Sequence, residues 1–218
     1  MDPKQVIDGL IMYLGLLVLL TFHEFGHAWM AWRCGDDTAR LQGRVSLNPI
    51  AHIDPIGTVV MPLLMIFFSG AFFGRFLVGW AKPVPVNPYN LRNPRVDDIL
   101  VTLAGPWMNL LLAIVIMGLG RIGLAANSPS TALLCWKMAH LSLLLCFFNL
   151  LPIPPLDGSQ VVRSLIGMTY EAYYQFARYG FIVLIIVINI PIVRDTLWGV
   201  TDKYTSLIAD LFGVPSVV

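Results

Sequence analysis

The sequence predicts an all-α polytopic membrane protein, with about four to five transmembrane helices and one re-entrant or hairpin element. Hydrophobic residues make up 57% of the 218 residues and charged residues only 12%, whereas soluble proteins carry about 25% charged residues. Mean hydropathy is +0.73. Several apolar runs approach the roughly 20 residues that a helix needs to cross a bilayer. These observations favour a chain built largely within the membrane.

The apolar runs give the predicted helices in order. The first extends from about Gln5 to Arg33, and two nearly uncharged runs follow at Ile99–Leu119 and Ala132–Leu151. A shorter apolar run at Tyr179–Ile192 predicts one more span. The residues Asp195–Val218 mix polar and apolar side chains, which is typical of a helix at the membrane surface.

The apolar segment Ile56–Trp80 differs from these runs because Pro62, Gly74 and Arg75 interrupt it. If it returns to the side where it entered, the cytoplasmic face collects most of the 14 Lys and Arg residues, namely Arg33, Arg40, Arg44, Arg75, Lys82, Arg92, Arg95, Arg163 and Arg178. The positive-inside rule favours this arrangement, and so does the cost of an arginine in the hydrocarbon layer. We therefore predict a re-entrant or hairpin element here.

No repeat, low-complexity tract or polar stretch of domain size divides the chain, so we expect a single integral membrane domain over residues 1–218. Its core motifs fall within 10–165, and a C-terminal helix with an interfacial tail occupies 172–218.

The formal net charge of +1 gives no indication of a nucleic-acid partner. Cys34, Cys135 and Cys146 lack the spacing of a disulfide pair or a metal knuckle, so we expect free thiols.

The first predicted helix carries the pentapeptide His23-Glu24-Phe25-Gly26-His27 within its apolar run. Ionisable side chains at membrane depth cost roughly 2.5–3.5 kcal/mol each on insertion scales, so they are kept mainly where they have a role. Residues four apart lie on one face of a helix, about 6 Å apart along its axis. His23 and His27 can therefore reach one Zn²⁺, with Glu24 beside them as general base. The pattern predicts a metallohydrolase that works within the bilayer.

A catalytic zinc usually has three protein ligands and one open position, so a third ligand is expected elsewhere in the chain. Asp157 follows Pro152, Pro154 and Pro155, where a regular helix cannot continue. Irregular backbone at membrane depth generally lines a polar cavity. An aspartate after prolines also commonly caps the next helix, which leaves both roles open at this point. The other candidates are His52, Asp54, Asp97, Asp98, His140 and Glu171.

Simpler explanations account for three of these candidates. His52 and Asp54 lie in a proline-rich loop, where turn formation explains them. His140 lies inside the run Ala132–Leu151, and we expect it to make an interhelical hydrogen bond rather than to bind metal.

Three ordered segments resemble the signature segments of the site-2 protease family, which are intramembrane zinc metalloproteases. They are His23-Glu24-Phe25-Gly26-His27-Ala28, then Ala104-Gly105-Pro106 with Asn109, then Asn149 followed by Leu156-Asp157-Gly158. Their order and spacing match over about residues 10–165. The residues that connect the motifs, such as Gly79–Pro88, resemble those of the compact prokaryotic branch of the family, which has no PDZ or CBS domains.

The resemblance implies that His23, His27 and Asp157 bind one Zn²⁺ per chain and that Glu24 activates water. It also implies cleavage of transmembrane protein substrates in a prokaryotic cell (inner) membrane, as in regulated intramembrane proteolysis. The predicted topology directs the active site toward the cytoplasm. Asn109 and Asn149 are placed near the metal, where each can hydrogen-bond the oxyanion or position the substrate. Hydrogen bonding between helices is the alternative for both.

Two other functions use similar residues. A membrane zinc transporter would also place histidine and aspartate in membrane helices, but it has no need of Glu24. A non-proteolytic relative that acts as a membrane binding protein would typically have lost the glutamate or a ligand. This chain keeps His23, Glu24, His27 and Asp157, so the sequence favours the endopeptidase.

Overall fold

The computed structural model describes residues 3–68 and 79–215, and all regular secondary structure in these ranges is helical. The predicted all-α class is therefore confirmed. The long helices are α1 (Pro3–Arg33), α4 (Pro94–Ala125), α5 (Pro129–Asn149) and α9 (Pro191–Phe212). The shorter elements are α2 (Thr38–Leu41), η1 (Pro49–His52), η2 (Pro55–Val60), α3 (Met61–Phe68), η3 (Pro88–Asn90), α6 (Asp157–Ile166), α7 (Tyr170–Ala177) and α8 (Gly180–Ile188).

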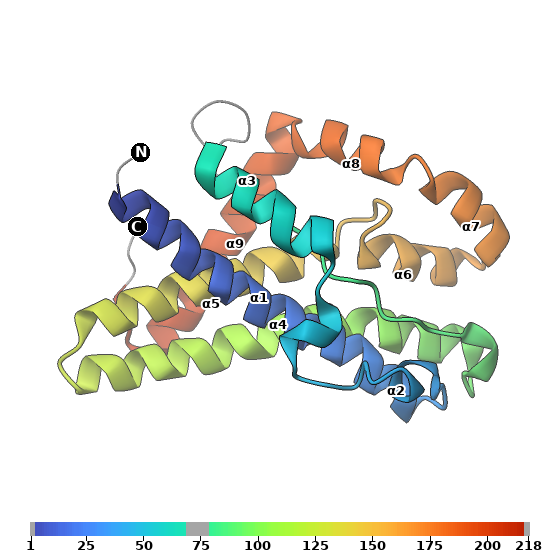
Figure 1. The fold of residues 1–218 in the computed structure, drawn as a ribbon, viewed down its shortest axis with the longest axis horizontal. Helices are drawn as coiled ribbons and strands as arrows, with labels where there is room; N and C mark the ends of the chain where they lie inside the picture. Colours follow the sequence, from blue (N-terminus) through green and yellow to red (C-terminus); the bar gives the residue numbers. More distant parts are fainter. Residues whose placement is uncertain (1–2, 69–78, 216–218) are drawn as a thin grey trace.

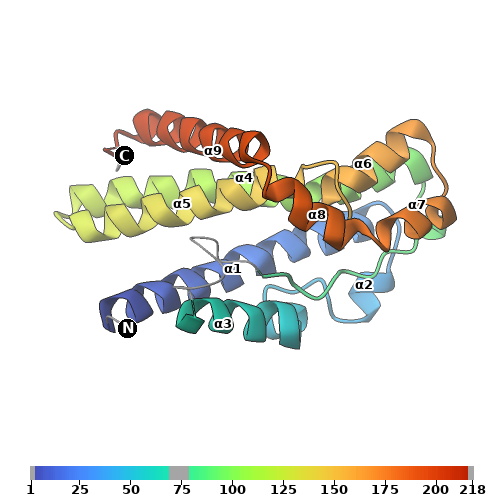
Figure 2. The ribbon, with the colours of Figure 1, turned by 90° about the horizontal axis from the view of Figure 1, so that it is seen from above.

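The helices α1, α4 and α5 form the central bundle and lie side by side in both views (Figures 1 and 2). Leu16 of α1 is almost fully buried and packs with Leu141 of α5. Ala113 of α4 packs in the same way with Leu143 of α5. The small side chain of Ala113 allows α4 and α5 to approach closely. The bundle therefore fixes the relative positions of the three segments that carry the sequence motifs.

Three of the described helices are long and apolar enough to cross a membrane, namely α4, α5 and the Val6–Arg33 part of α1. The helices α7 and α8 together pass the same test, but they are bent by 57° at the break between them. They form either a broken fourth span or a re-entrant loop. Among the described residues there are thus three spans, and the predicted number of four to five is reached only if the bent pair counts as one span.

The predicted span Tyr179–Ile192 is shorter in the structure, because α8 ends at Ile188 and Pro191 begins α9. Proline lacks the amide donor that a helix interior needs, but it suits the first position of a new helix. Helix α9 then runs along the side of the bundle away from α1 (Figure 2). It packs on α4 and α5 through Ile208 and Ala209.

His140 connects α5 to α9 rather than to the predicted metal site. Its Nε2 lies 2.8 Å from Oδ1 of Asp202. The imidazole stacks between the rings of Trp136 and Trp198, at centroid distances of 5.3 and 5.7 Å. The interhelical hydrogen bond predicted for His140 is therefore confirmed.

The two ends of the segment Ile56–Trp80 are bonded to each other. The amide of Trp80 donates to the carbonyl of Gly57 at 3.2 Å, and Oγ1 of Thr58 donates to the carbonyl of Trp80 at 2.8 Å. Residues 69–78, which include Gly74 and Arg75, lie outside the described residues. Because Gly57 and Thr58 are hydrogen-bonded to Trp80, the two described ends of this segment lie side by side. A re-entrant or hairpin element requires its ends to lie on one side of the membrane in this way.

This topology predicts a labelling pattern in intact cells. In a variant lacking Cys34, Cys135 and Cys146, single cysteines at the exposed positions Asp37 and Asn93 should both resist an impermeant thiol reagent. A cysteine at Ala126, in the α4–α5 turn, should react as the control for the opposite face. Reaction at Asn93 with protection at Asp37 would show that the chain crosses the membrane between them, and would contradict the hairpin.

A buried carboxylate anchors the segment that follows this hairpin to the end of α1. Asp36 is fully buried and accepts hydrogen bonds from the amide of Asn87 at 2.7 Å and from Nδ2 of Asn90 at 2.9 Å. Burial alone would raise the pKa of Asp36, but these bonds and those from Thr38 hold it below its ordinary value. Nearby, the guanidinium of the buried Arg44 donates to the carbonyl of Lys82. Residues 79–90 are thereby held beside the bundle.

Candidate metal centre

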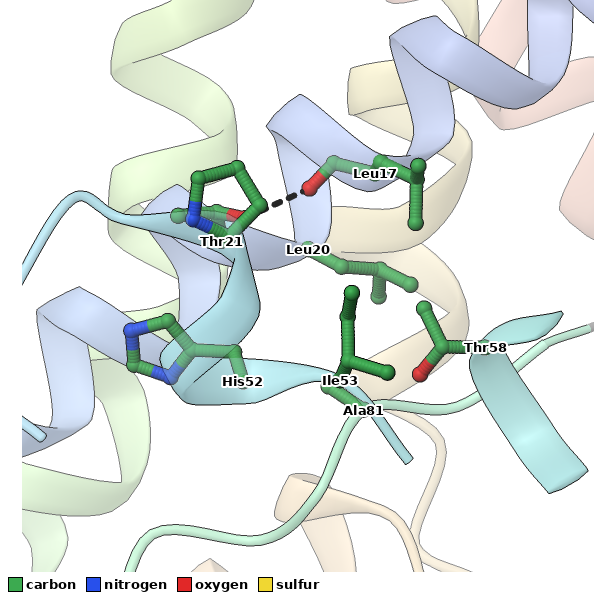
Figure 3. Close-up of a pocket in the computed structure, with 8 residues that line it drawn as sticks. Leu17, Leu20, Thr21, His52, Ile53, Thr58 and Ala81 are labelled. Carbon is green, nitrogen blue, oxygen red and sulfur yellow. Dashed lines mark hydrogen bonds between the residues drawn. The ribbon is translucent and has the colours of Figure 1, made fainter. Parts of the chain in front are cut away.

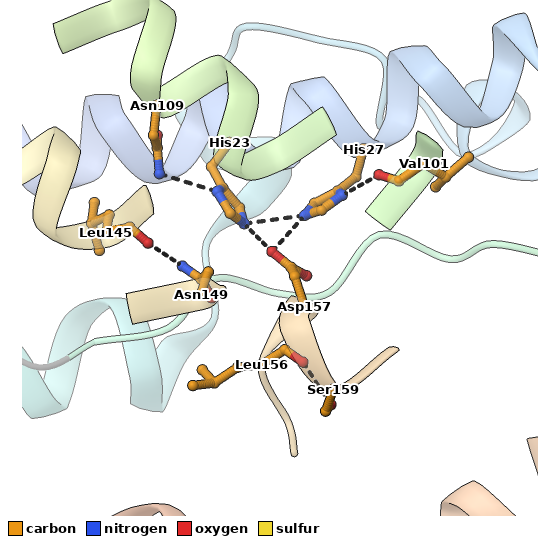
Figure 4. A network of polar contacts seen from close by, with 9 residues as sticks. All are labelled: His23, His27, Val101, Asn109, Leu145, Asn149, Leu156, Asp157 and Ser159. Carbon is orange, nitrogen blue, oxygen red and sulfur yellow. Dashed lines mark hydrogen bonds and ion pairs between the residues drawn. The ribbon is translucent and has the colours of Figure 1, made fainter. Parts of the chain in front are cut away.

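Three side chains from two distant parts of the sequence converge in the structure (Figure 4). His23 and His27 project from α1, and their Nε2 atoms are 3.1 Å apart. Oδ2 of Asp157 lies 3.2 Å from Nε2 of His23 and 3.4 Å from Nε2 of His27. The potential ligand atoms all lie within 4.8 Å of one another, and among the described residues this is the one such group of three. Asp157 is the first residue of α6 and Leu156 holds the N-cap position.

The donor set fits a metal ion. Nδ1 of His27 lies 2.8 Å from the carbonyl of Val101. Since a carbonyl only accepts, this nitrogen carries the proton and leaves a lone pair on Nε2. Oδ2 of Asp157 is buried and receives no hydrogen bond of normal geometry from the described groups. When His23 also carries its proton on Nδ1, both Nε2 atoms and Oδ2 of Asp157 present lone pairs to one point, and two imidazoles with one carboxylate are a catalytic zinc set.

Glycines make room for this arrangement. A Cβ atom at Gly105 of α4 would lie 2.3 Å from Nε2 of His27 and 2.7 Å from Cε1 of His23. A Cβ atom at Gly26 of α1 would lie 2.7 Å from the carbonyl oxygen of Ala104. Both contacts are shorter than van der Waals distance, so the close approach of α1 and α4 requires glycine at both positions.

Replacement of Gly105 by alanine is therefore expected to displace the imidazoles and to lower zinc content, as measured by metal analysis of the purified protein. Gly118→Ala is the matched control, because it lies on the same helix and its Cβ would meet only an ordinary contact at 3.4 Å from Phe212. Equal zinc content in the two variants would contradict this explanation of Gly105.

A polar network fixes the helix that begins with Asp157. Asp98 of α4 binds the guanidinium of Arg163 and the hydroxyl of Ser164, both on α6 and both buried. The hydroxyl of Tyr170 on α7 donates to Asp98 at 2.6 Å. The turn before α6 is also tightly packed, because a Cβ atom at Gly158 would lie 2.2 Å from the carbonyl oxygen of Leu150. These contacts hold α6 against α4 and so set the position of Asp157.

The three converging side chains open into a cavity of about 770 Å³, which Glu24 and Asn149 also line. Asn149 donates from Nδ2 to the carbonyl of Leu145 at 2.9 Å. Asn109 does not line the cavity, because its fully buried side chain lies behind His23. The cavity walls include the segment 79–86, Phe181 and Leu184 of α8, Tyr170, Tyr174 and Gln160.

The sequence prediction did not include Gln160, Tyr170 or Tyr174 of this cavity. Gln160 lies three residues after Asp157 on the same helix, and this spacing places the two on one face. This spacing could have identified Gln160 as a neighbour of the metal site from the sequence alone. No local pattern marks the two tyrosines, because only the packing of α7 beside the cavity brings them there.

The other candidate ligands have structural roles. His52 is buried, and its Nε2 lies 2.8 Å from the carbonyl of Ser46. Figure 3 shows the neighbouring Ile53 beside Leu20 of α1, in a small hollow separate from the metal group. Asp54 caps η2 by accepting from the amides of Ile56 and Gly57, as turn formation predicts. Asp97 accepts from the amide of Asn93, and Glu171 lies in the first turn of α7.

The comparison with family models identifies the chain. The model of peptidase family M50 matches residues 11–133 and 120–189. The chain belongs to peptidase family M50, the site-2 protease family. The resemblance predicted from the motifs is therefore confirmed, and the matched ranges contain all six site residues named above, namely His23, Glu24, His27, Asn109, Asn149 and Asp157.

Relatives in the M50 family are similar over most of the chain. The candidate zinc metalloprotease YwhC of Bacillus subtilis strain 168 is 38% identical over 205 residues, which cover 90% of this chain and 88% of YwhC. The candidate zinc metalloprotease Rip2 of Mycolicibacterium smegmatis is 32% identical over 87% of this chain and 71% of its own length. Rip2 of Mycobacterium tuberculosis strain H37Rv is 34% identical over 85% of this chain. No solved structure matches the chain.

Proposed function

We propose that this M50 chain is a zinc-dependent intramembrane endopeptidase, which hydrolyses peptide bonds within or near transmembrane segments of other membrane proteins. The observation that carries the proposal is the convergence of His23, His27 and Asp157 on a cavity that Glu24 also lines. His23, Glu24 and His27 lie on α1, which is long and apolar enough to cross a membrane, and Asp157 begins α6, after the proline-rich turn that follows α5. A single Zn²⁺ per chain is the expected cofactor.

The proposed chemistry divides between the metal and the side chains. His23, His27 and Asp157 would hold the zinc ion, which would supply a bound water with a pKa of about 7 and polarise the scissile carbonyl. Glu24 accepts the proton of the attacking water and passes it to the leaving amide nitrogen. Asn149 lines the cavity, so its amide can donate a hydrogen bond to the carbonyl oxygen that gains negative charge.

The substrate has to expose its peptide bonds, because an intact helix keeps them in its own hydrogen bonds. The segment 79–86 lines the cavity without regular secondary structure. Its residues Trp80 and Lys82 are bonded to the η1–η2 region and to Arg44. The backbone groups of Ala81 and Val84 have no partner among the described residues. We propose that an unwound stretch of substrate adds to these groups as an extended strand.

The proposal also places the enzyme in the cell membrane of a prokaryote, with transmembrane proteins as substrates. His23 and His27 lie in the C-terminal half of α1, near Arg33. The predicted positive-inside topology puts that end of α1 in the cytoplasm. The active site is therefore proposed to open to the cytoplasm.

The test uses purified protein in liposomes with a model transmembrane substrate labelled at both ends. Fragments should appear, and mass spectrometry should map the cut within or near the substrate's transmembrane segment. Vesicles that instead transport zinc, without any cleavage by zinc-loaded protein, would support the transporter and contradict the endopeptidase. Intact substrate without transport would favour a non-proteolytic binding protein.

A further inference from the structure

Asn109 of α4 has no task in the proposed hydrolysis. Its side chain is fully buried and does not line the cavity. Nδ2 of Asn109 lies 3.1 Å from Nδ1 of His23, as Figure 4 shows. Oδ1 of Asn109 is buried and has no hydrogen-bond partner among the described residues. Buried side-chain oxygens are nearly always hydrogen-bonded, so this one requires an explanation.

The protonation of the two imidazoles supplies the explanation. Each imidazole that binds a metal through Nε2 must present a lone pair there, so its proton resides on Nδ1. For His27, the carbonyl of Val101 accepts the hydrogen bond that this Nδ1–H donates. For His23, the group beside Nδ1 is the side chain of Asn109. An amide NH₂ group cannot accept a hydrogen bond, whereas an amide oxygen can.

We propose that Asn109 presents Oδ1 to the Nδ1 proton of His23 when metal is bound, and so fixes the tautomer and orientation of that ring. A half-turn of the amide exchanges its oxygen and nitrogen without moving the backbone. The backbone itself is held, because Ser142 of α5 donates to the carbonyl of Asn109 at 2.7 Å. Asn109 is thus a positioning residue for His23, as the carbonyl of Val101 is for His27. This inference rests on the proposed zinc site.

The experiment compares two substitutions that differ in their ability to accept a hydrogen bond. Asn109→Leu removes the acceptor at similar size, whereas Asn109→Asp keeps it. Zinc affinity would be measured by competition with a chelator, and the visible spectrum of the Co²⁺-loaded protein would report the ligand geometry. We expect Asn109→Leu to weaken zinc binding about 10- to 100-fold and to alter the cobalt spectrum. Asn109→Asp should restore both toward the wild type.

Thr205→Val is the control, since it removes a buried hydrogen bond within α9, from Oγ1 of Thr205 to the carbonyl of Thr201 at 2.8 Å, and leaves Asn109 and His23 untouched. It should leave zinc affinity and the cobalt spectrum unchanged. Asn109→Ala gives the same comparison if leucine is not accommodated.

Two results would overturn this inference without overturning the proposed function. Wild-type zinc affinity in Asn109→Leu with reduced cleavage would show that the amide acts on the substrate. Equal loss of zinc in Asn109→Asp and Asn109→Leu would show that an acceptor is not what His23 requires. A wild-type protein that binds no zinc would overturn the proposed function as well, so the two failures are distinguishable.

Discussion

Replacement of Glu24 by glutamine is expected to abolish peptide cleavage while leaving zinc bound. Glutamine has the shape of glutamate but cannot accept the proton of the attacking water, and loss of a general base typically costs 10²- to 10⁴-fold in rate, to order of magnitude. Glu24 lines the cavity but is not in the metal-binding group, so the ligands are untouched. Zinc content and cleavage would be measured on the same preparation.

Asp8→Asn is the control for this experiment. Asp8 is the other carboxylate of α1, and it is exposed near the N-terminal end of the helix. Its substitution should change neither cleavage nor zinc content. Near-normal cleavage by Glu24→Gln would exclude Glu24 as the base, and loss of zinc would show that Glu24 has a role in metal binding.

Replacement of Asp157 by alanine is expected to lower zinc occupancy at least about tenfold. It removes the carboxylate oxygen that lies 3.2 and 3.4 Å from the two Nε2 atoms, and two ligands hold zinc far more weakly than three. Occupancy would be measured by metal analysis after dialysis against a weak chelator. Cleavage should fall in parallel.

The same measurement on His52→Ala and His140→Ala provides the controls. His52 is bonded to the carbonyl of Ser46, and His140 is bonded to Asp202. Neither belongs to the metal-binding group of the described residues, so both variants should keep their zinc. If His140→Ala lost the metal and Asp157→Ala kept it, the proposed ligand set would be wrong.

Much of the candidate site could be predicted because its chemistry depends on local spacing. Two histidines four residues apart on a helix necessarily share a face, and the proline-broken stretch before Asp157 marked irregular backbone at membrane depth. The structure brings these segments together, as the motif order predicted. The apolar runs likewise located α1, α4 and α5, because the length needed to cross a bilayer is nearly constant.

Other features depend on tertiary contacts that no local pattern encodes. The pairing of Asp98 with Arg163 joins residues far apart in the chain, and either could equally have been a solvent-exposed charge. The sequence also could not show which side of α4 faces α1. It therefore placed Asn109 near the metal without showing that it lies behind His23. The bend between α7 and α8 was not predicted, because the apolar run interpreted as a span begins at Tyr179, at the break, and the less apolar residues of α7 were not assigned to it.

The central claim is that this chain cleaves membrane-embedded peptide bonds with one zinc ion held by His23, His27 and Asp157. The most direct measurement removes the metal from the reconstituted wild-type protein with a chelator and then restores it stepwise. We predict that cleavage of the transmembrane substrate disappears on removal and returns in proportion to bound zinc, reaching its maximum at one ion per chain. Cleavage that persists at full rate in the zinc-free protein would contradict the claim.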